Sequence, residues 1–535
     1  MDQALLQVKD LTVAFKNDKV VNQISFDVFP GETFALVGES GSGKSITALS
    51  VLRLLPNNAK VSATEVLLND DDLFKLSESD FCQVRGKRIA LIFQDPMSSL
   101  NPVMTIGEQI AEVLEIHFNY SKTVIKQAVS ELLNQVEMPE PLRRVNEFPH
   151  QLSGGQRQRV MIAMALEGKP DLLIADEPTT ALDVTIQAQI LRLLKSIQKK
   201  TGMALWLISH DLALVSNMAD RIAVMQQGKI VETGDVKEFF SQAKHPYSLK
   251  LLAALPSMAS CENRSKETLV NNDAFLKVEN FKVYYPIREG FFKRVVDYVK
   301  AVDGVTFELQ KGRTLALVGE SGCGKTTLGK GLVNLVPSTE GRVLVDNIDL
   351  SHLKSDILRK KRSEIQIVFQ DPFASMNPRM LVGEIIEEGL RALYPELDSA
   401  NRQVRVDKLL QQVELPVESA LRYPHEFSGG QRQRICIARA LAVEPRLIIC
   451  DEPTSALDVS VQAQIIKLLK KLQKEKHISY LFITHDLAVV AEIADEVAVM
   501  YQGKIVEHGR VQQVLIQPKH QYTKKLLQAV PQIKN

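Results

Sequence analysis

The stretch that decides the fold is TFALVGESGSGKS at Thr33–Ser45, a short apolar run followed by a glycine-rich turn and a helical segment. Glycines allow backbone N–H groups to converge on phosphate oxygens, and the helix that follows adds its positive end. This strand–turn–helix context is the one that a phosphate loop requires. Because TLALVGESGCGKT repeats the pattern at Thr314–Thr326, a chance glycine-rich turn does not explain it.

The phosphate loop is one of five motifs that occur twice and in the same order, with the copies 275–281 residues apart. Such a period is far too long for a solenoid repeat and indicates a duplicated domain. We predict domains at 1–257 and 275–535, joined by a polar linker at 258–274. The second copy carries about eleven additional residues near PIREGFFKRVVDYVK (Pro286–Lys300), which predict an extended hairpin.

Within each copy, short β-branched runs alternate with helical stretches, as in TFALVG, RIALIF, LLIAD, ALWLIS and RIAVM of the first copy. This order predicts the α/β class and, together with the two phosphate loops, two tandem P-loop NTPase domains. Each would have a mostly parallel sheet flanked by helices. The segment from about 97 to 170 lacks such runs and predicts an inserted helical subdomain.

Composition restricts the possible functions. Lys and Arg number 65 against 64 Asp and Glu, so the net charge of +1 predicts no strong field for nucleic acid or anionic lipid. None of the five cysteines forms a C-x-x-C pair, which argues against a zinc site or a disulfide framework and favours a reducing, cytosolic setting. No apolar run approaches the ~20 residues needed to span a bilayer.

Two acids end a buried-strand run in each copy, and a histidine ends the next strand. The first acid suits Mg²⁺ coordination, the second suits orientation of an attacking water, and the histidine suits a γ-phosphate contact. The alternative is that these residues merely cap the ends of their strands. The recurrence of the same residues at one offset in both copies argues against that alternative. The pairs, in that order, are Asp176 and Asp451, Glu177 and Glu452, and His210 and His485.

Together with FQDP and SGGQ, these motifs resemble the nucleotide-binding domain of ABC ATPases over essentially the whole chain, twice. The resemblance implies ATP and Mg²⁺ as cofactors. It also implies that Gln94 and Gln370 bind Mg²⁺ and the attacking water beside a membrane partner. An aromatic residue before the phosphate loop would stack on adenine, although Phe15 and Tyr285 could equally be ordinary strand aromatics.

The predicted sites fall into three groups. The catalytic group is Glu177, His210, Glu452, His485, Gln94 and Gln370. The ATP-binding group of the first copy is Phe15, Gly38, Glu39, Ser40, Gly41, Ser42, Gly43, Lys44, Ser45, Ser153, Gly154, Gly155, Gln156 and Asp183. That of the second copy is Tyr285, Gly319, Glu320, Ser321, Gly322, Cys323, Gly324, Lys325, Thr326, Ser428, Gly429, Gly430, Gln431 and Asp458. The metal group is Ser45, Gln94, Asp176, Thr326, Gln370 and Asp451.

The signature loop SGGQRQR occurs at Ser153–Arg159 and Ser428–Arg434, each time before a helical run. A serine hydroxyl and glycine N–H groups at a helix start form a second anion cradle. The family's head-to-tail arrangement implies that each loop covers the nucleotide held by the other copy's phosphate loop. The two halves would then pair within one chain. The Arg and Gln tail is expected to hold the loop and helix start.

The segments HPYSLKLLAALP (His245–Pro256) and HQYTKKLLQAVP (His520–Pro531) resemble those of dipeptide and oligopeptide importers, including fused single-chain ATPases. Mechanically, each predicts a helix that closes its domain. The resemblance implies two transmembrane permease subunits, indirectly an extracytoplasmic peptide-binding protein, and a peripheral location on the cytoplasmic face of the inner membrane. Only Cys261 lies where some relatives carry an iron–sulfur cluster, so no cluster is expected.

Two other functions compete. A tandem ABC ATPase of ribosomes or nucleic acid would carry a basic segment, zinc cysteines or a coiled-coil insertion. None of these is evident here, so no nucleic-acid partner is expected. A sugar-importer ATPase would lack the FQDP…NP and H-x-Y segments.

Overall fold

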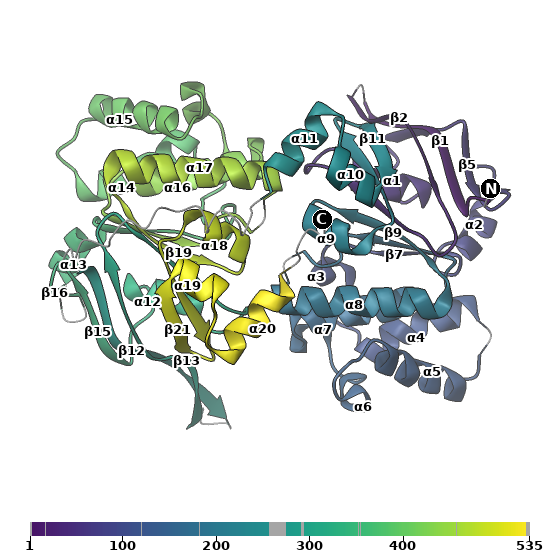
Figure 1. The fold of residues 1–535 in the computed structure, drawn as a ribbon, viewed down its shortest axis with the longest axis horizontal. Helices are drawn as coiled ribbons and strands as arrows, with labels where there is room; N and C mark the ends of the chain where they lie inside the picture. The colour runs from purple at the N-terminus through teal and green to yellow at the C-terminus, as the bar shows by residue number, and fades with distance from the viewer. Residues whose placement is uncertain are drawn as a thin grey trace. The chain divides into compact units, whose positions relative to one another are not determined.

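The computed structural model describes residues 3–16, 18–118, 120–180, 182–255, 274–289, 294–350, 353, 355–455 and 457–530. The chain divides after Leu255 into two compact units, coloured purple to teal and teal-green to yellow in Figure 1. The predicted linker 258–274 lies outside the described residues, apart from Ala274.

The main sheet of the first unit has the strand order β11-β10-β3-β9-β8-β7. All neighbours pair in parallel except β10 and β11. Every predicted strand is present, which confirms the predicted fold class. The bounds are β3 (Thr33–Val37), β7 (Ile89–Ile92), β8 (Leu172–Asp176), β9 (Ala204–Ser209), β10 (Arg221–Gln226) and β11 (Lys229–Asp235).

A second, antiparallel sheet was not anticipated from the sequence. It has the order β2-β1-β5-β6, and β4 also pairs with β1. Its strands are β1 (Leu6–Phe15), β2 (Asp18–Val28), β4 (Ala59–Ser62), β5 (Glu65–Leu68) and β6 (Asp71–Asp72). Helix α1 (Lys44–Val51) shares one buried apolar cluster with both sheets, including Leu11, Val51 and Trp206.

The inserted helical subdomain lies between β7 and β8, as predicted. Its elements are α3 (Pro96–Ser99), α4 (Ile106–His117), α5 (Lys122–Gln135), α6 (Pro141–Arg144), η1 (Pro149–Gln151) and α7 (Gly154–Leu166). Ile110, Leu133 and Val160 join its helices to the core beneath the main sheet. The other helices of this unit are α2 (Glu78–Val84), α8 (Val184–Thr201), α9 (Leu212–Met218), α10 (Val236–Gln242) and α11 (Pro246–Ala253).

The second unit repeats this plan, with the main sheet in the order β17-β18-β19-β14-β20-β21 and the second sheet in the order β13-β12-β15-β16. Its strands are β12 (Ala274–Glu289), β13 (Arg294–Gln310), β14 (Thr314–Val318), β15 (Glu340–Val345), β16 (Ile348–Asp349), β17 (Ile365–Val368), β18 (Leu447–Asp451), β19 (Ser479–Thr484), β20 (Glu496–Tyr501) and β21 (Lys504–Arg510). Its helices are α12 (Lys325–Leu332), α13 (Ser355–Arg362), α14 (Val382–Leu393), α15 (Ser399–Gln412), η3 (Val417–Leu421), η4 (Pro424–Glu426), α16 (Gly429–Leu441), α17 (Val459–Lys476), α18 (Leu487–Ile493), α19 (Val511–Ile516) and α20 (Gln521–Ala529).

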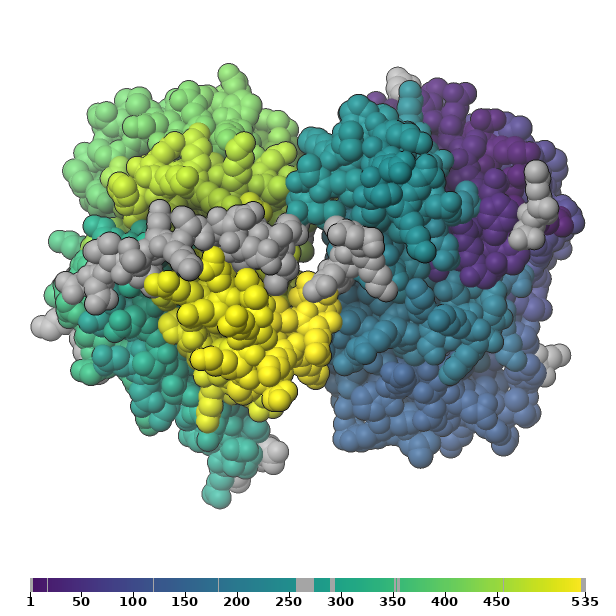
Figure 2. Space-filling view, viewed as in Figure 1, coloured from purple at the N-terminus to yellow at the C-terminus, as the bar shows by residue number. Residues whose placement is uncertain are grey.

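The predicted hairpin extension is confirmed. Strands β12 and β13 remain paired through Pro286↔Tyr298 and Ile287↔Asp297 and continue to Glu289↔Arg294. The hairpin projects from the body of the second unit (Figures 1 and 2). Val296, Tyr298 and Val299 on β13 are exposed.

Candidate nucleotide sites

Each phosphate loop folds around its lysine. Lys44 donates from Nζ to the carbonyl oxygens of Gly38 at 2.7 Å and Glu39 at 2.9 Å. Lys325 makes the same two bonds, to Gly319 at 2.7 Å and Glu320 at 2.9 Å. Burial lowers the pKa of Lys44, and the charge of Glu177 opposes this shift. The ammonium group of each lysine is therefore held against its own phosphate loop, whose N–H groups can donate to phosphate oxygens.

The last glycine of each loop is required by the backbone. Gly43 and Gly324 precede α1 and α12 with φ of 106° and 107°, in the left-handed region that glycine favours. A Cβ at Gly324 would lie 2.0 Å from the carbonyl oxygen of Ala301. The turn can therefore enter its helix only with glycine at this position.

A hydroxyl and a carboxylate meet beside each loop. Thr326 donates from Oγ1 to Oδ1 of Asp451 at 3.0 Å. Burial raises the pKa of Asp451 and of Asp176, and hydrogen bonds from Thr326 and Ser45 oppose that shift. Oδ1 of Asp176 is buried without a hydrogen-bond partner among the described residues.

These oxygen ligands fit Mg²⁺, which binds through one or two protein oxygens together with substrate phosphates. Within the part of the chain that the structure describes, His, Cys, Asp and Glu form no cluster of three or more that would hold a metal by itself. This chemistry supports the magnesium assignment of Ser45, Asp176, Thr326 and Asp451. The assignment stays a prediction for these residues, as it does for Gln94 and Gln370.

The second acid of each pair is the centre of a hydrogen-bonded group. Oε2 of Glu177 accepts from Nε2 of Gln94 at 2.7 Å and from Oγ1 of Thr180 at 2.9 Å, while Oε1 accepts from Nδ1 of His210 at 2.9 Å. In the second unit Gln370 donates to Glu452 at 2.9 Å, and His485 lies 3.3 Å from the same carboxylate. The predicted Gln, Glu and His residues thus come together in both copies.

The contact between the glutamate and the histidine shifts the pKa of both side chains. Burial alone would raise the pKa of Glu177, but the hydrogen bond and charge of His210 hold that pKa below its usual value. Burial alone would lower the pKa of His210, and Glu177 raises it instead. The pair therefore favours an anionic carboxylate, the form that can accept a proton from water.

Both glutamates have φ of 46°, a left-handed conformation that is uncommon for non-glycine residues. The N–H of Glu177 donates to the carbonyl of Ile208 on β9, and that of Glu452 donates to Ile483 on β19, both at 2.9 Å. These bonds fix the turn after β8 and β18 against the neighbouring strand. The carboxylate is thereby brought beside the histidine that follows that strand.

Each signature loop starts a helix with a reciprocal cap. Ser153 accepts at Oγ from the N–H of Gln156 at 3.4 Å, and Gln156 accepts at Oε1 from the N–H of Ser153 at 3.0 Å. Ser428 and Gln431 form the same capping box before α16. In this structure the glutamine amide therefore shapes the helix start.

The two arginines of the signature motif hold the loop to its surroundings, as expected for the tail, whereas Nε2 of Gln158 is buried without a hydrogen-bond partner among the described residues. Arg157 donates to the carbonyl of Pro149 at 2.7 Å, and Arg159 donates to that of Val136 at 2.6 Å. A Cβ at Gly155 would lie 2.6 Å from Cγ2 of Ile186 on α8, so this glycine permits close packing of two helices.

The other predicted residues are more dispersed. Asp183 caps α8, where its Oδ1 accepts from the N–H of Ile186 at 3.1 Å, and Asp458 immediately precedes α17. Phe15 is half-buried at the end of β1, and Tyr285 on β12 is exposed. Adenine stacking by these aromatics stays a prediction. Cys261 lies outside the described residues, so the expectation about an iron–sulfur cluster stays a prediction as well.

Thr180 is a site residue that the sequence did not single out. Its hydroxyl bonds the Glu177 carboxylate only because the left-handed turn brings position 180 back over the glutamate. The available signal was its place three residues after Glu177, within a motif that occurs twice.

The fold and these two sites define a P-loop ATPase with two nucleotide-binding cassettes. A family model described as "ABC transporter" matches residues 21–180 and 302–455, and a second, "Oligopeptide/dipeptide transporter, C-terminal region", matches 231–276 and 506–535. The chain belongs to the ABC transporter family and is an ATPase of that family.

Similar proteins extend over nearly the full chain. The "Peptidoglycan transport ATP-binding protein YejF" of Agrobacterium fabrum is 48% identical over 532 residues, covering 98% of this chain and 96% of that protein. The "Glutathione import ATP-binding protein GsiA" of Escherichia coli (strain K12) is 48% identical over 560 residues, covering 98% and 89%. A solved dimeric ATP-binding cassette with ADP and Pi covers 44% of this chain and 98% of its own, at 32% identity and a TM-score of 0.40.

Among the described residues, no helix is both long enough and apolar enough to cross a membrane.

Proposed function

We propose that this chain is the ATP-hydrolysing subunit of an importer for peptide-like substrates. The observation that carries the proposal is the H-x-Y region, which follows both cassettes and matches the oligopeptide/dipeptide transporter model at residues 231–276 and 506–535. The names of the two relatives, which refer to peptidoglycan transport and glutathione import, support small peptide-like cargo.

In each site the loop residues bind ATP phosphates, and the buried lysine supplies positive charge to them. The bound Mg²⁺ would neutralise phosphate charge, held by Ser45 and Asp176 in the first copy and by Thr326 and Asp451 in the second. Glu177 and Glu452 accept the proton of the attacking water. Their glutamine and histidine neighbours orient the carboxylates.

In this proposal each cassette completes the nucleotide site of the other. Ser153–Gln156 would cover the nucleotide on Lys325, and Ser428–Gln431 the one on Lys44, in the head-to-tail arrangement that the family implies. Fusion makes this pairing intramolecular and raises its effective concentration. Closure with ATP and opening after hydrolysis would drive two permease subunits on the cytoplasmic face of the inner membrane.

The pairing is tested by Ser428→Arg, which places a bulky cation where a phosphate would bind. Site-resolved nucleotide trapping should fall at the site that contains Lys44 and persist at the site that contains Lys325. The reverse pattern would contradict head-to-tail pairing.

The transport role is tested by purifying the tagged full-length chain from membranes and identifying its partners. Two permease subunits should co-purify, and reconstituted vesicles should hydrolyse ATP faster with a peptide-loaded binding protein than without one. Recovery of ribosomes or nucleic acid in place of permeases would favour the alternative tandem ATPase, and stimulation by sugar-loaded protein would favour a sugar importer.

A further inference from the structure

The H-x-Y segments reach back to the phosphate loops. In the first unit the hydroxyl of Tyr247 accepts from the N–H of Glu39 at 3.2 Å. In the second unit the hydroxyl of Tyr522 accepts from the N–H of Glu320 at 2.9 Å. Both tyrosines are buried. The segment that closes each domain therefore contacts the loop that begins its nucleotide site.

The Tyr247 hydroxyl contacts the peptide unit that joins Gly38 to Glu39. The N–H of Glu39 and the carbonyl of Gly38 belong to the same planar peptide group, and Lys44 donates to that carbonyl at 2.7 Å. Tyr247 thus binds the N–H of this peptide unit, and Lys44 binds its carbonyl at the opposite edge. Rotation of the plane would break both bonds and would move the lysine ammonium group.

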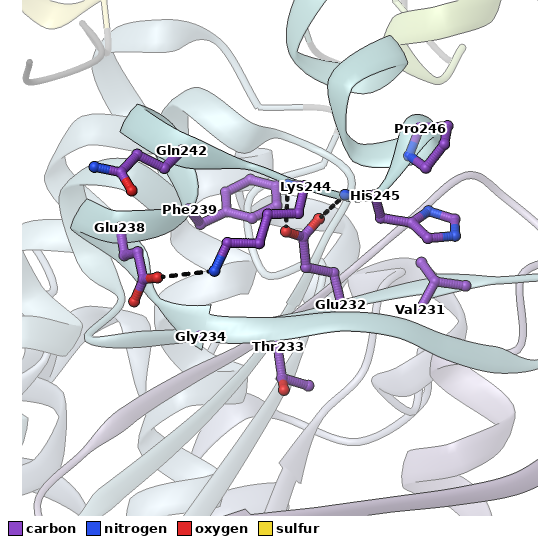
Figure 3. Close-up of a pocket in the computed structure, with 10 residues that line it drawn as sticks. All are labelled: Val231, Glu232, Thr233, Gly234, Glu238, Phe239, Gln242, Lys244, His245 and Pro246. Carbon is purple, nitrogen blue, oxygen red and sulfur yellow. Dashed lines mark hydrogen bonds and ion pairs between the residues drawn. The ribbon is translucent and has the colours of Figure 1, made fainter.

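The tyrosine is itself held in place from the edge strand β11. Figure 3 shows the Glu232 carboxylate accepting from the backbone N–H groups of Lys244 and His245, at 2.7 and 3.2 Å. His245 then caps α11 by accepting at Nδ1 from the N–H of Tyr247 at 3.2 Å. The second unit repeats these contacts through Glu507, His520 and Tyr522.

Glu232, Lys244 and His245 border a hollow of about 460 Å³ in the first unit, which is lined also by Phe239 and Pro246 (Figure 3). Glu232 is therefore held at an open edge, whereas Tyr247 is enclosed. Burial raises the pKa of Tyr247 to about 12, so its hydroxyl stays neutral beside the phosphate loop.

The bond from the tyrosine to the phosphate loop forms in both copies, although the two contacts span different lengths of chain. Glu39 and Tyr247 are 208 residues apart, whereas Glu320 and Tyr522 are 202 apart. The intervening segments differ in length by six residues (208 − 202), but the bond is present in both copies. Packing of a closing helix alone does not require a hydroxyl at this point.

We propose that Tyr247 and Tyr522 are positioning residues of the nucleotide sites, whose hydroxyls fix the first peptide unit of each phosphate loop for ATP binding. This inference rests on the proposed role of the phosphate loops. The tyrosines act through the loop and the lysine.

The test uses Tyr247→Phe in a Lys325→Ala background and Tyr522→Phe in a Lys44→Ala background, so that each full-length variant has one intact loop. The dissociation constant of a fluorescent ATP analogue should rise about 3- to 10-fold relative to the background variant, as expected for loss of one hydrogen bond. In chains without the lysine changes, the KM for ATP should rise while kcat at saturation changes by less than about twofold.

A matched control is Tyr501→Phe. Tyr501 packs against Tyr522 with ring centroids 4.3 Å apart, and its hydroxyl accepts from Nε2 of Gln502 instead of bonding the loop. The substitution should leave the dissociation constant unchanged. An unaltered dissociation constant in Tyr247→Phe and Tyr522→Phe, with an unchanged unfolding midpoint, would overturn the proposal. If Lys44→Ala also leaves binding at the first site intact, the proposed nucleotide role itself fails.

Discussion

The two cassettes share the residues that would handle phosphate but differ in what surrounds them. Lys44 and Lys325 make the same two loop contacts, and Glu177 and Glu452 both adopt φ of 46°. In contrast, Thr180 bonds the Glu177 carboxylate, whereas Ser455 donates to the main-chain oxygen of Glu452. The groups predicted to react are thus duplicated, while the hydroxyl contacts beside them differ. We expect differences in rate between the two sites to originate in those contacts.

The largest difference is expected at the helix-start glycines. In Gly324→Ala the new Cβ would lie 2.0 Å from the Ala301 carbonyl oxygen, whereas in Gly43→Ala the nearest atoms are a flexible methionine terminus at 2.8 Å and the Val20 carbonyl oxygen at 2.9 Å. Because the rigid backbone clash is worse in the second copy, we expect nucleotide binding there to fall at least ~30-fold and binding in the first to fall ~10-fold, with single-site dissociation constants as the measurement.

Gly41→Ala and Gly322→Ala serve as controls. Both positions have φ near 80°, but an added Cβ meets no described heavy atom within 4 Å. Their cost should be the backbone strain alone, about 1 kcal/mol. Equal losses at all four glycines would contradict the steric explanation.

A smaller effect is expected where the copies differ in side-chain charge. Arg439 donates from Nη1 to the carbonyl of Ser375 at 2.6 Å, whereas Met164 occupies the equivalent place in the first copy. Arg439→Met should lower the free energy of unfolding by about 1–3 kcal/mol, since a charge-assisted bond is lost. Denaturant unfolding measures this change, with the exposed Arg379→Met as the control. Equal losses in both variants would show that the bond is not the cause.

The third difference between the copies should make the stability of the protein depend on pH. Burial raises the pKa of Glu167 to about 7, and Ala442 stands at the equivalent place in the second copy. For an acid whose folded pKa is raised, the stability present below its unfolded pKa near 4.5 is lost as pH rises to about 7. Glu167→Ala should therefore stabilise the protein by about 1 kcal/mol at pH 8, after allowance for solvent screening, and by less at pH 5. A pH-independent change would argue against the ionisation.

The smallest effect is expected from the hydroxyls beside Glu177 and Glu452. Thr180→Ala removes a hydrogen bond that helps to keep the pKa of Glu177 low, so the acidic limb of the first site's pH–rate profile should move upward and its rate should fall about 2- to 5-fold. Ser455→Ala serves as the counterpart: Ser455 donates to the main-chain oxygen of Glu452 and is the last of the contacts that lower the pKa of that carboxylate, so the acidic limb of the second site should move less. Identical pH profiles for the two variants would contradict the proposed asymmetry.

Much of this architecture follows from local sequence. The apolar runs before GESGSGKS and before each Asp–Glu pair predict the parallel strands, because short buried strands bounded by glycine turns leave a clear pattern. The strand ends then place Glu177 near His210, and the structure brings the two together.

What the sequence could not predict depends on long-range pairing. The antiparallel sheet was missed because β1 and β2 change register several times, which obscures their alternation. The Tyr247–Glu39 contact joins residues 208 positions apart, and the Thr180 contact depends on a left-handed residue. Neither leaves a periodic signal in one sequence.

The central claim is that both cassettes are equipped to hydrolyse ATP. Its most direct test is site-resolved single-turnover hydrolysis in Glu177→Gln and Glu452→Gln, each made alone, because the amide keeps the shape but cannot accept the proton. We predict that each substitution slows hydrolysis at its own site about 10²-fold or more. Undiminished hydrolysis at either substituted site would contradict the claim and would show that this cassette binds nucleotide without using its glutamate.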